Sequence, residues 1–482
     1  MGLLLDWESS MKQLIKNLGY QTIYQMLAVC LPLITTPYIS RVLGAESLGI
    51  YSYTYSIVNY FTIFAMMGIL NYGSRSIAIV KKDKQLRSKK FWEIYSLQLV
   101  SSLMAILGYC VVIFISSDNK EIVIAQAIWV VACIFDISWF FFGIEKFKVT
   151  VIRNTVIKLL TVIAIFLFVR TAEDLWKYVV IMSMGTLLSQ LALWPFLRRE
   201  IIYCKPSIQG ILSHLKPNFL LFIPLIATSV YHIMDKTMLG IFSTYEQSGF
   251  YYNADKVINI PLSLITAMGT VMLPRMSFLV AEGRKDEEGR LFNQTLDLFM
   301  FLTYAMSFGI VAVAQEFIPV FFGNGYEVCI QLIYVFAIVM IIKSLSSIIR
   351  NQYLIPNNEE KVYTCSVIAG AILNFICNYV FLVPLKLGAM GATLGTLIAE
   401  FATCLFYVIF IQRRINILKP IIGSLIYVIP GLVMIFAVQL CALLDISIFV
   451  RLVFEIAVGA GIYLLFCIPI LKKKMRIMSN AG

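Results

Sequence analysis

The sequence predicts an all-α protein that crosses a membrane about fourteen times. Three observations carry this prediction. Of the 482 residues, 60% are hydrophobic and only 14% are charged, whereas roughly 25% are charged in soluble domains. Apolar runs long enough to span a bilayer, about 20 residues, recur along the chain. Between these runs, segments rich in Lys and Arg alternate with nearly neutral ones. Because these connecting segments are short, we expect the function to lie within the membrane.

We place the spans by breaking the sequence at charge clusters and at Gly, Pro and Asn turns. The predicted spans are Asn17–Ser40, Ser47–Tyr72, Phe91–Ile115, Ile122–Phe142, Ile152–Val169, Trp176–Leu197, Leu215–Ile241, Gly249–Leu273, Phe292–Ala314, Val328–Ile349, Val362–Leu385, Gly391–Ile411, Pro420–Leu443 and Ile448–Leu471. Asp255 and Lys256 lie inside the eighth of these spans, and Lys343 lies inside the tenth.

The distribution of Lys and Arg predicts the orientation of the spans. These residues gather around positions 12–16, 75–90, 145–153, 198–216, 275–290, 412–419 and 472–476. Intervening segments such as SSDNKE, STYEQSG and FFGNGYE have few or none. This positive-inside pattern places both termini in the cytoplasm and accounts for most of the net charge of +12. No nucleic-acid partner is expected, because the chain lacks a basic patch interleaved with exposed aromatic residues in a soluble domain.

A short phrase occurs at equivalent places in the two halves of the chain. LGAESLGIY begins at Leu43, and LGIFSTYEQSGFY begins at Leu239. The matched pairs are LPLIT with IPLIA, Gly44 with Gly240, Glu46 with Glu246, Gly49 with Gly249, Tyr51 with Tyr251, Asn59 with Asn259 and Arg75 with Arg275. The offset grows from 192 to 200 in steps of four, about one helical turn, so matched residues keep their helix face. A weaker match pairs WFFFGIEKFKV with NQYLIPNNEEKV.

These matches predict two six-helix lobes related by an axis along the membrane normal, with a site between them near the middle of the membrane. The expected parts are residues 1–200 (spans 1–6), 201–412 (spans 7–12), and 413–482, which add two helices and a basic cytoplasmic tail.

Motifs of enzymes and ATP-driven pumps do not occur. The chain has no G-x-x-x-x-G-K-[ST], no H-E-x-x-H and no G-x-S-x-G, so we expect neither class. Its ten cysteines form no C-x-x-C, and it has only two histidines, so we expect no metal centre and no cofactor. If the protein moves a solute across the membrane, its energy would have to come from an H⁺ or Na⁺ gradient or from the gradient of that solute.

Three stretches resemble the Wzx-type polysaccharide flippases of the multidrug/oligosaccharidyl-lipid/polysaccharide (MOP) exporter superfamily. They are the opening from NLGYQTIYQ to NYGSRSIA, WFFFGIEKFK from Trp139, and LGAMGATLGTLIAE from Leu387 to Glu400. The resemblance covers nearly the whole chain in order and spacing. It implies fourteen helices, with two six-helix lobes forming a V and two extra C-terminal helices.

The resemblance also implies a function. Such a protein moves undecaprenyl-diphosphate-linked oligosaccharide repeat units from the inner to the outer leaflet of the bacterial cytoplasmic membrane by alternating access. Membrane lipid surrounds it, and the polymerase and chain-length proteins of the same pathway are candidate partners.

A flippase for a diphosphate needs cations on an internal wall, because a charge that faces lipid is costly. The candidates for a cationic cavity are Arg41, Arg153, Lys158, Lys236, Lys256 and Arg350. Arg153 and Arg350 lie at matching cytoplasmic turns, where the bidentate geometry of Arg suits an incoming diphosphate.

Four of these six cations have a structural alternative. Arg41, Lys158 and Lys236 could instead snorkel to the lipid headgroups. Lys256 could instead form a local pair with Asp255.

Carboxylates within the spans are candidates for ion coupling. Asp235 either balances Lys236 or carries a coupling proton or Na⁺, and Asp136 and Glu400 are alternative proton carriers.

Prolines lie within the first helix of each half, at Pro32, Pro37 and Pro224. Proline removes a helical hydrogen bond and permits a kink. The match between LPLI and IPLI predicts paired hinges, and the alternative is that proline is simply frequent in membrane helices.

Three other functions stay open. A drug or cation exporter of the same fold, like the MATE proteins, would prefer an acidic, aromatic cavity. A glycan polymerase or ligase would need a sizeable outward loop with catalytic groups. A flippase for peptidoglycan precursors is a close relative of the favoured function.

Overall fold

The computed structural model describes residues 2–480, with side chains for residues 30–474 except residue 224. All regular elements of this described part are helical. The chain divides into two compact units, residues 1–233 and 234–482, which are described one at a time. The division falls within the helix Ile208–Phe242 (α9), so the last turns of α9 belong to the second unit.

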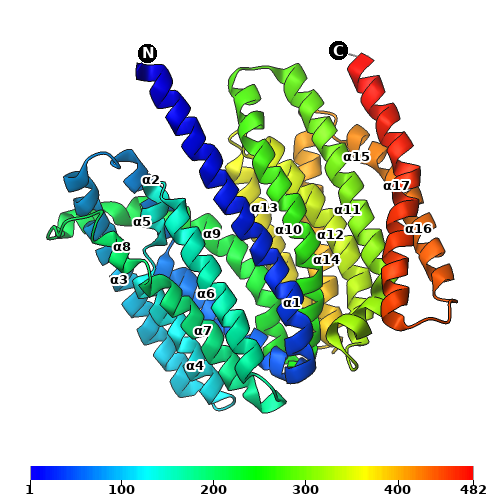
Figure 1. Cartoon of the computed structure of the whole chain (residues 1–482), viewed down its shortest axis with the longest axis horizontal. Helices are drawn as coiled ribbons and strands as arrows, with labels where there is room; N and C mark the ends of the chain where they lie inside the picture. Colours follow the sequence, from blue (N-terminus) through cyan, green and yellow to red (C-terminus); the bar gives the residue numbers. More distant parts are fainter. Residues whose placement is uncertain (1, 481–482) are drawn as a thin grey trace. The chain divides into compact units, whose positions relative to one another are not determined.

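The first unit is a bundle of long helices joined by short turns (Figure 1). Its elements are α1 (Gly2–Met66), α2 (Ile69–Ile79), α3 (Lys84–Ile115), α4 (Lys120–Phe135), α5 (Ser138–Gly143), α6 (Phe147–Phe168), the 3₁₀ turn η1 (Ala172–Asp174), α7 (Leu175–Leu191), α8 (Trp194–Leu197) and the first part of α9. The start of α1 and the α2–α3 turn lie at one end of this unit, and the α3–α4 and α6–α7 turns lie at the other.

The first of the two matched corners is a glycine turn inside α1. Gly44 has φ 77° and separates two helices, and glycine adopts this left-handed backbone without a steric penalty. The backbone stays helical through Pro32 and Pro37, so the marked change of direction in α1 comes at the glycine. The sequence therefore locates the corner correctly at LGAES.

The second corner uses different turn chemistry. Gly240 lies inside α9, which continues to Phe242. The next helix, α10 (Tyr245–Ala281), begins after Thr244, whose hydroxyl accepts a hydrogen bond from the backbone N–H of Gln247 at 3.2 Å. Because this cap satisfies a free N–H of the new helix, the turn forms four residues later than the matched glycine.

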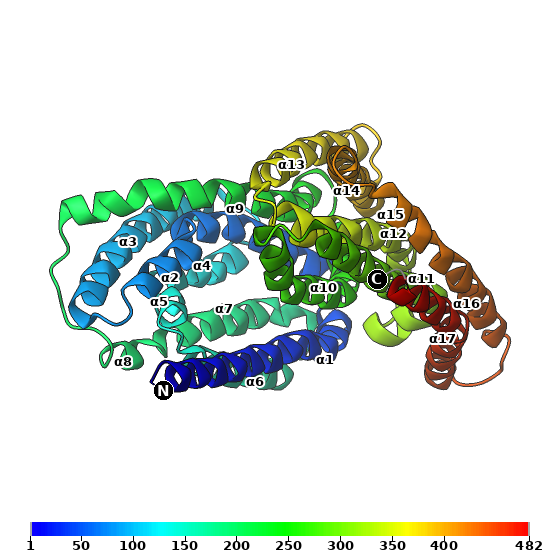
Figure 2. The same cartoon turned by 90° about the horizontal axis from the view of Figure 1, so that it is seen from above.

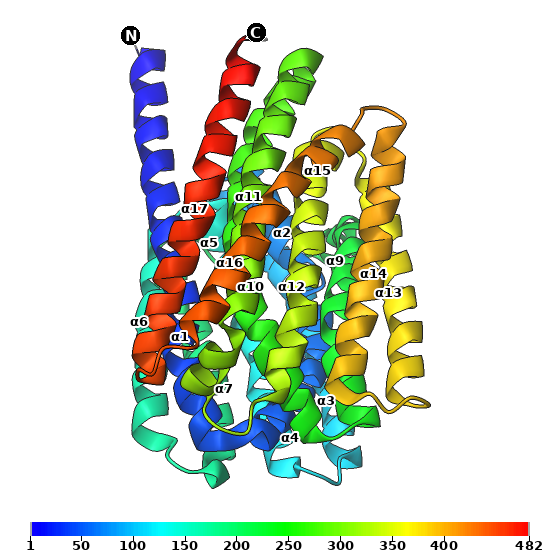
Figure 3. The same cartoon turned by 90° about the vertical axis from the view of Figure 1, so that its right-hand side faces the viewer.

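The second unit continues from the last turns of α9 (Figures 1 and 3). Its further elements are α10, α11 (Lys285–Phe322), α12 (Val328–Ile349), the π-helical turn η2 (Arg350–Leu354), α13 (Glu360–Leu382), α14 (Gly388–Gln412), α15 (Leu418–Ser424), the 3₁₀ turn η3 (Leu425–Tyr427), α16 (Val428–Cys441) and α17 (Ile448–Asn480). The α10–α11, α12–α13 and α14–α15 turns lie at the same end as the C-terminal part of α17.

The last two helices pack on α11, as the view from above shows (Figure 2). The Tyr463 hydroxyl of α17 donates to the Phe301 carbonyl of α11 at 2.9 Å. At the C-terminal end of α17, the Lys474 ammonium contacts Asp297 Oδ1 of α11 at 2.5 Å and donates to the Gly423 carbonyl at 3.0 Å. The Tyr427 hydroxyl donates to the other Asp297 oxygen at 2.7 Å. One carboxylate thus joins α11, η3 and α17.

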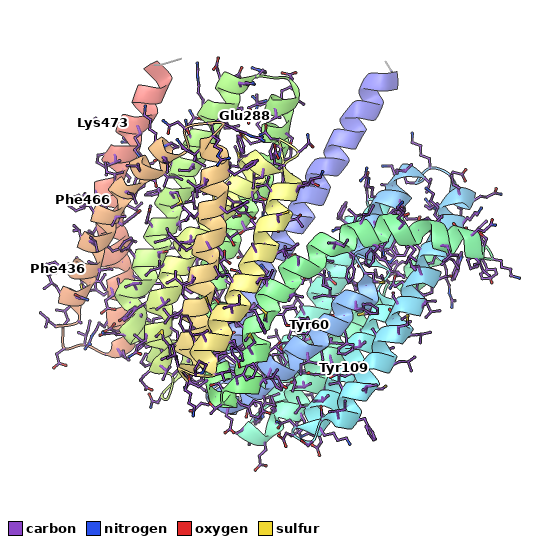
Figure 4. The ribbon with its side chains drawn as sticks, turned by 180° about the vertical axis from the view of Figure 1, so that it is seen from behind. Tyr60, Tyr109, Glu288, Phe436, Phe466 and Lys473 are labelled. Carbon is purple, nitrogen blue, oxygen red and sulfur yellow. The ribbon has the colours of Figure 1, made fainter. Side chains whose placement is uncertain are left out.

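The outer surface of both units is apolar. In Figure 4, Phe436 on α16 and Phe466 on α17 project outward from the second unit, whereas Glu288 and Lys473 mark one end of it. Because a soluble protein rarely exposes contiguous apolar surface of this extent, the apolar faces of the helices are suited to lipid.

The number of spans confirms the predicted fold class. Twelve helical segments are long and apolar enough to cross a membrane, and α9, bent by 46° between Ile208–Ile223 and Leu225–Phe242, makes thirteen. One segment, Cys30–Ile79, has 50 residues, about 75 Å of helix, and is divided at Gly44. The described part of the chain thus has twelve to thirteen candidate spans, close to the fourteen predicted.

The two turns that matched weakly in sequence share one hydrogen-bond pattern. In the first unit, Glu145 has φ 60° and the N–H of Lys146 donates to the Phe141 carbonyl at 2.9 Å. In the second unit, Asn358 has φ 58° and the N–H of Glu359 donates to the Leu354 carbonyl at 2.8 Å. Both are helix ends closed by a residue in the left-handed region, which agrees with a repeat.

Candidate functional site

Six ionisable side chains gather inside the second unit, on four helices. They are Asp235 and Lys236 on α9, Asp255 and Lys256 on α10, Lys343 on α12 and Glu400 on α14. Asp235 lies seven residues before the end of α9, and Lys256 lies eleven residues after the start of α10. At 1.5 Å per residue this is about 10–17 Å from the turn that joins the two helices. We call these six residues the charged cluster.

The Asp235 carboxylate is buried and held by three neutral donors. Its Oδ2 accepts hydrogen bonds from the Tyr251 hydroxyl at 2.5 Å and the Thr396 hydroxyl at 2.7 Å. Its Oδ1 accepts from the Asn378 amide at 2.6 Å. Asn378 also donates to Asn374 Oδ1 at 3.3 Å, and its own Oδ1 has no hydrogen-bond partner in the described part of the chain. Asp235 is only 4% exposed, so these donors replace the water that an exposed carboxylate would bind.

Lys236 and Asp255 form an ion pair between α9 and α10. The ammonium lies 3.0 Å from Asp255 Oδ2, and Asp255 Oδ1 accepts from the Asn259 amide at 2.7 Å. The Lys236 ammonium also lies 5.7 Å from the ring centroid of Tyr252. The structure therefore places Lys236 beside a carboxylate inside the unit.

Lys343 and Glu400 form a second, looser pair between α12 and α14. The Lys343 Nζ lies 3.6 Å from Glu400 Oε1, and the Glu400 residue is 6% exposed. Lys343 also interacts electrostatically with Asp255 and Asp235. The two ion pairs and the Asp235 carboxylate are thus coupled by charge.

Lys256 differs from the two other lysines of the cluster. Its ammonium lies 5.2 Å from the ring centroid of Tyr252, a cation–π contact. Within the part of the chain whose side chains are described, no carboxylate lies within 4 Å of it. The predicted alternative, a local pair with Asp255, is not formed, because Asp255 pairs with Lys236 instead.

The candidates of the first unit lie in other surroundings. Arg153 on α6 is buried, and its guanidinium donates to the Ser189 carbonyl at 2.6 Å and to the Gln190 side chain at 3.0 Å, both on α7. Lys158 on α6 is half-buried, and Arg41 on α1 is exposed. These three cations are not part of the charged cluster of the second unit.

Asp136 and Arg350 lie at breaks between helices. Asp136 Oδ1 accepts from the backbone N–H of Ser138 at 2.9 Å and from its hydroxyl at 2.5 Å, between α4 and α5. Arg350 begins the π-helical turn η2 and stacks on the ring of Tyr363 at 5.4 Å. Of the hinge candidates, Pro224 lies outside the described side chains.

Sequence reasoning missed the neutral partners of Asp235. Asn374 and Asn378 are four residues apart on an apolar helix, so they share one face of α13, and this spacing is a readable signal. Thr396 and Tyr251 carry no comparable signal, because their contacts with Asp235 join residues 161 and 16 positions apart. Lys343 and Asp255 were recognised as charges within spans but not assigned to the site.

The chain is similar to two proteins that are named as O-antigen transporters. It is 24% identical to a protein of Shigella dysenteriae named "Putative O-antigen transporter" over 78% of this chain and 94% of that one. It is 23% identical to the protein of the same name from Escherichia coli K12, over 83% and 97% of the two chains. Both names describe transporters rather than enzymes, which agrees with the expectation from the missing motifs.

Solved structures share the fold. A lipid II flippase MurJ in an inward closed conformation superposes with a TM-score of 0.76 and 16% identity, over 94% of this chain and 99% of that one. An inward-facing MATE family multidrug transporter of the MOP superfamily gives a TM-score of 0.60 and 14% identity, over 84% and 99%. The resemblance to the MOP fold inferred from sequence is thereby confirmed.

The family follows from the first part of the chain. Residues 14–280 match the family model described as "Polysaccharide biosynthesis protein". These residues include the repeated corner and the α9 and α10 members of the charged cluster. Because the match covers more than half of the residues, this multi-pass membrane protein belongs to the polysaccharide biosynthesis protein family.

Proposed function

We propose that this protein is a flippase that moves undecaprenyl-diphosphate-linked oligosaccharide repeat units from the inner to the outer leaflet of the bacterial cytoplasmic membrane by alternating access. The names of the O-antigen transporters support the class of substrate. The observation that carries the proposal is Lys256, a cation inside a membrane bundle with no carboxylate in ion-pair distance among the described residues.

A cation without a counter-ion in a membrane-spanning segment is costly. An anion that enters the unit would remove this cost, and a diphosphate carries at least two negative charges. Lys256 and Lys236 both approach the ring of Tyr252, at 5.2 and 5.7 Å from its centroid. Two ammonium groups around one ring form a compact cationic site for the two phosphates.

The balance of charges argues for an anionic substrate over a cationic drug. Three lysines and three carboxylates make the charged cluster neutral when all are ionised. Because Lys236 and Lys343 neutralise two of the carboxylates, the remaining carboxylate is Asp235, which neutral donors already satisfy. An exporter of organic cations would need negative charge that is not already compensated.

Asp235 is the coupling site in this proposal. Its surroundings are rich in oxygen atoms from Tyr251, Thr396 and Asn374, and the unpartnered Oδ1 of Asn378 adds another. Hydroxyl groups can rotate to accept instead of donate. The same group of side chains can therefore hold either a proton on Asp235 or a desolvated Na⁺ among hard oxygen ligands.

The orientation follows from the positive-inside pattern. Both termini would lie in the cytoplasm, together with the basic α10–α11 turn and the C-terminal part of α17. The turns at the opposite end of the second unit are only a few residues long, for example residues 323–327 and 383–387. They leave no room for the large outward catalytic loop of a polymerase or ligase.

The test is the leaflet position of the lipid-linked glycan in a strain deleted for the gene and restored with variants. We expect the unit to accumulate on the cytoplasmic face in the deletion, and the intact gene to clear it. Lys256→Ala should clear it about tenfold more slowly or worse, because one charge-assisted contact is lost. Membrane levels of the protein should be unchanged.

The matched control is Lys361→Ala, which removes an exposed lysine at the start of α13 in the same unit. This variant should clear the glycan normally. Full activity of both Lys256→Ala and Lys236→Ala would contradict the cationic site. An unchanged glycan in the deletion strain would instead favour a drug exporter, and unpolymerised units on the outer face would favour a polymerase.

A further inference from the structure

Two carboxylic acids lie between α11 and α17, outside the charged cluster. Glu316 is on α11 and Glu455 is on α17, and these two helices pack against each other. Glu316 is 9% exposed, Glu455 is completely buried, and the two acids interact electrostatically. Because an acid inside a membrane-spanning segment is costly and commonly functional, this pair needs an explanation of its own.

Glu455 lacks the contacts that hold a buried carboxylate. Both of its carboxyl oxygens are buried, and neither has a hydrogen-bond partner among the residues whose side chains are described. Asp235, by contrast, accepts hydrogen bonds from three side chains. An ionised carboxylate without such donors is very costly in an apolar interior, so the group takes up a proton instead.

The charges around Glu455 fit one proton. Arg451 lies four residues earlier, on the same face of α17, and interacts electrostatically with Glu455. Its Nη2 lies 3.5 Å from the Ile446 carbonyl, and its Nε has no hydrogen-bond partner in the described part of the chain. On α16, which also packs against α17, Cys441 interacts with Glu455 and is uncharged at neutral pH. With one proton, the group formed by Glu316, Glu455 and Arg451 is neutral.

The acid pair lies at the end of the α11–α17 interface opposite to the Lys474–Asp297 ion pair. Glu455 comes seven residues after the start of α17, and Glu316 comes six residues before the end of α11. These two helix ends lie at the same end of the second unit (Figure 3). Asp297 and Glu316 are 19 positions apart on α11, about 28 Å, close to the thickness of the apolar part of a bilayer. An acid of α11 thus contacts a lysine of α17 near one membrane surface and faces a second acid near the other.

We propose that Glu316 and Glu455 form a proton-binding site, in which the pair holds one proton at neutral pH and Glu455 carries it. The proton removes the repulsion between two carboxylates and keeps this end of α17 on α11. In the orientation proposed above, the site lies near the outer surface of the membrane, so its proton would come from outside the cell. The site does not depend on the nature of the substrate.

A metal cation suits this site less well than a proton. Ca²⁺ takes roughly six to eight oxygen ligands, and the Arg451 guanidinium would repel any cation. Among the described residues, no group of three or more His, Cys, Asp or Glu side chains could hold a metal ion. Two carboxyl groups beside one arginine are therefore better matched to a single proton.

The experiment detects the neutral carboxyl group by infrared spectroscopy of the purified full-length protein in detergent. A protonated carboxyl group absorbs apart from a carboxylate, and its band shifts in heavy water, which identifies it. At neutral pH we expect the unaltered protein to show about one neutral carboxyl group more per chain than Glu455→Gln does. Glu360→Gln, which removes an exposed carboxylate at the start of α13, is the control and should keep the full band.

Two further variants distinguish a coupled pair from a single buried acid. Glu316→Gln removes the neighbouring negative charge, so the band should disappear at a lower pH than in the unaltered protein. Arg451→Gln removes the neighbouring positive charge, so the band should persist to a higher pH. Arg413→Gln, which removes an exposed arginine at the end of α14, is the matched control and should shift neither way. These shifts carry the test alone if Glu455→Gln does not accumulate in the membrane.

Equal bands in the unaltered protein and in Glu455→Gln would overturn the proton site. A band that appears only after Na⁺ and Ca²⁺ are removed would show that a metal cation occupies the site, and would overturn it as well. A band that neither Glu316→Gln nor Arg451→Gln shifts would overturn the pair. Each of these outcomes leaves the flippase function standing, because that function is tested separately through Lys256 and the leaflet position of the glycan.

Discussion

The two units carry different chemistry at matched positions. In the first unit, the ring of Tyr51 stacks on that of Tyr55, with the ring centroids 5.6 Å apart. The ring centroid of Tyr51 also lies 5.1 Å from that of Tyr178. In the second unit, the hydroxyl of the matched Tyr251 donates to Asp235. The residue four positions further is Tyr55 in the first unit and Asp255 in the second.

This difference teaches that a repeated scaffold need not repeat its function. The first unit fills the region with aromatic rings. One of them is Trp129, whose ring centroid lies 4.3 Å from that of Tyr55. Aromatic pairs of this kind add packing energy but hold no charge. The second unit places six ionisable side chains there. In our proposal, the second unit is therefore the one that responds to ions.

The largest effect is expected when charge is placed in the aromatic region. Tyr55→Asp would place a carboxylate beside the rings of Tyr51 and Trp129, at a half-buried position, without the lysine that its counterpart Asp255 has. A charge in a membrane-spanning segment without a counter-ion is costly. We expect the variant to be nearly absent from the membrane fraction, as measured by immunoblot. Tyr55→Phe is the control and should accumulate normally. Normal levels of Tyr55→Asp would show that the two regions are less different than the contacts indicate.

An intermediate effect is expected at the matched tyrosines. Tyr251→Phe removes one donor from Asp235, and a hydrogen bond to a charged group is worth about 1.5–3 kcal/mol, so the cation dependence of transport should shift about tenfold. The ion whose concentration dependence changes in this variant is the coupling ion. If Na⁺ couples, the loss of a ligand oxygen raises the Na⁺ concentration for half-maximal transport. If H⁺ couples, the dependence of transport on pH changes instead, and the dependence on Na⁺ does not.

Tyr51→Phe is the matched control for that experiment, because it keeps the ring and its stacking in the first unit. It should leave the dependence on Na⁺ and on pH unchanged. If neither the Na⁺ dependence nor the pH dependence of transport changes in Tyr251→Phe, Asp235 takes no part in coupling.

The smallest effect is expected at the edge of the aromatic region. Trp129 Nε1 donates to the Thr186 hydroxyl at 2.9 Å, and Trp129→Phe removes this bond but keeps a ring in place. We expect a loss of about 1 kcal/mol in stability, seen as a lower midpoint of thermal unfolding in detergent, with the ion dependence of transport unaffected. A changed ion dependence would mean that the first unit also takes part in coupling.

Much of the fold could be predicted from the sequence, because hydropathy and turn residues are local signals. The corner at Gly44 and the helix end at Glu145 illustrate this, since each depends on a few adjacent residues. The second corner was located only to within the stretch STYEQSG, because the cap at Thr244 competes with the matched Gly240 for the turn. A local sequence pattern does not show which of two such turn signals the chain will use.

The site could be predicted only in part. Lys236, Lys256, Asp235 and Glu400 were found because charge inside an apolar run is conspicuous. Their pairing was not found, because Lys343 and Glu400 are brought together by the packing of α12 against α14. Arg153 shows the reverse case, since its position at a turn favoured a phosphate contact, whereas its guanidinium binds the backbone of α7. Pattern alone does not tell which way a side chain points.

The carboxylate that joins α11 to α17 has a consequence for how the protein is made. Asp297 and Lys474 are 177 residues apart, which at about 5–20 residues per second is roughly 10–35 s of synthesis. During that interval α11 enters the membrane with an acid whose cation has not yet been translated, and a charge at this depth resists release into lipid. We expect the insertion machinery to keep α11 near water or protein until α17 has been made. The arrival of α17 is then the step that supplies the cation of this acid.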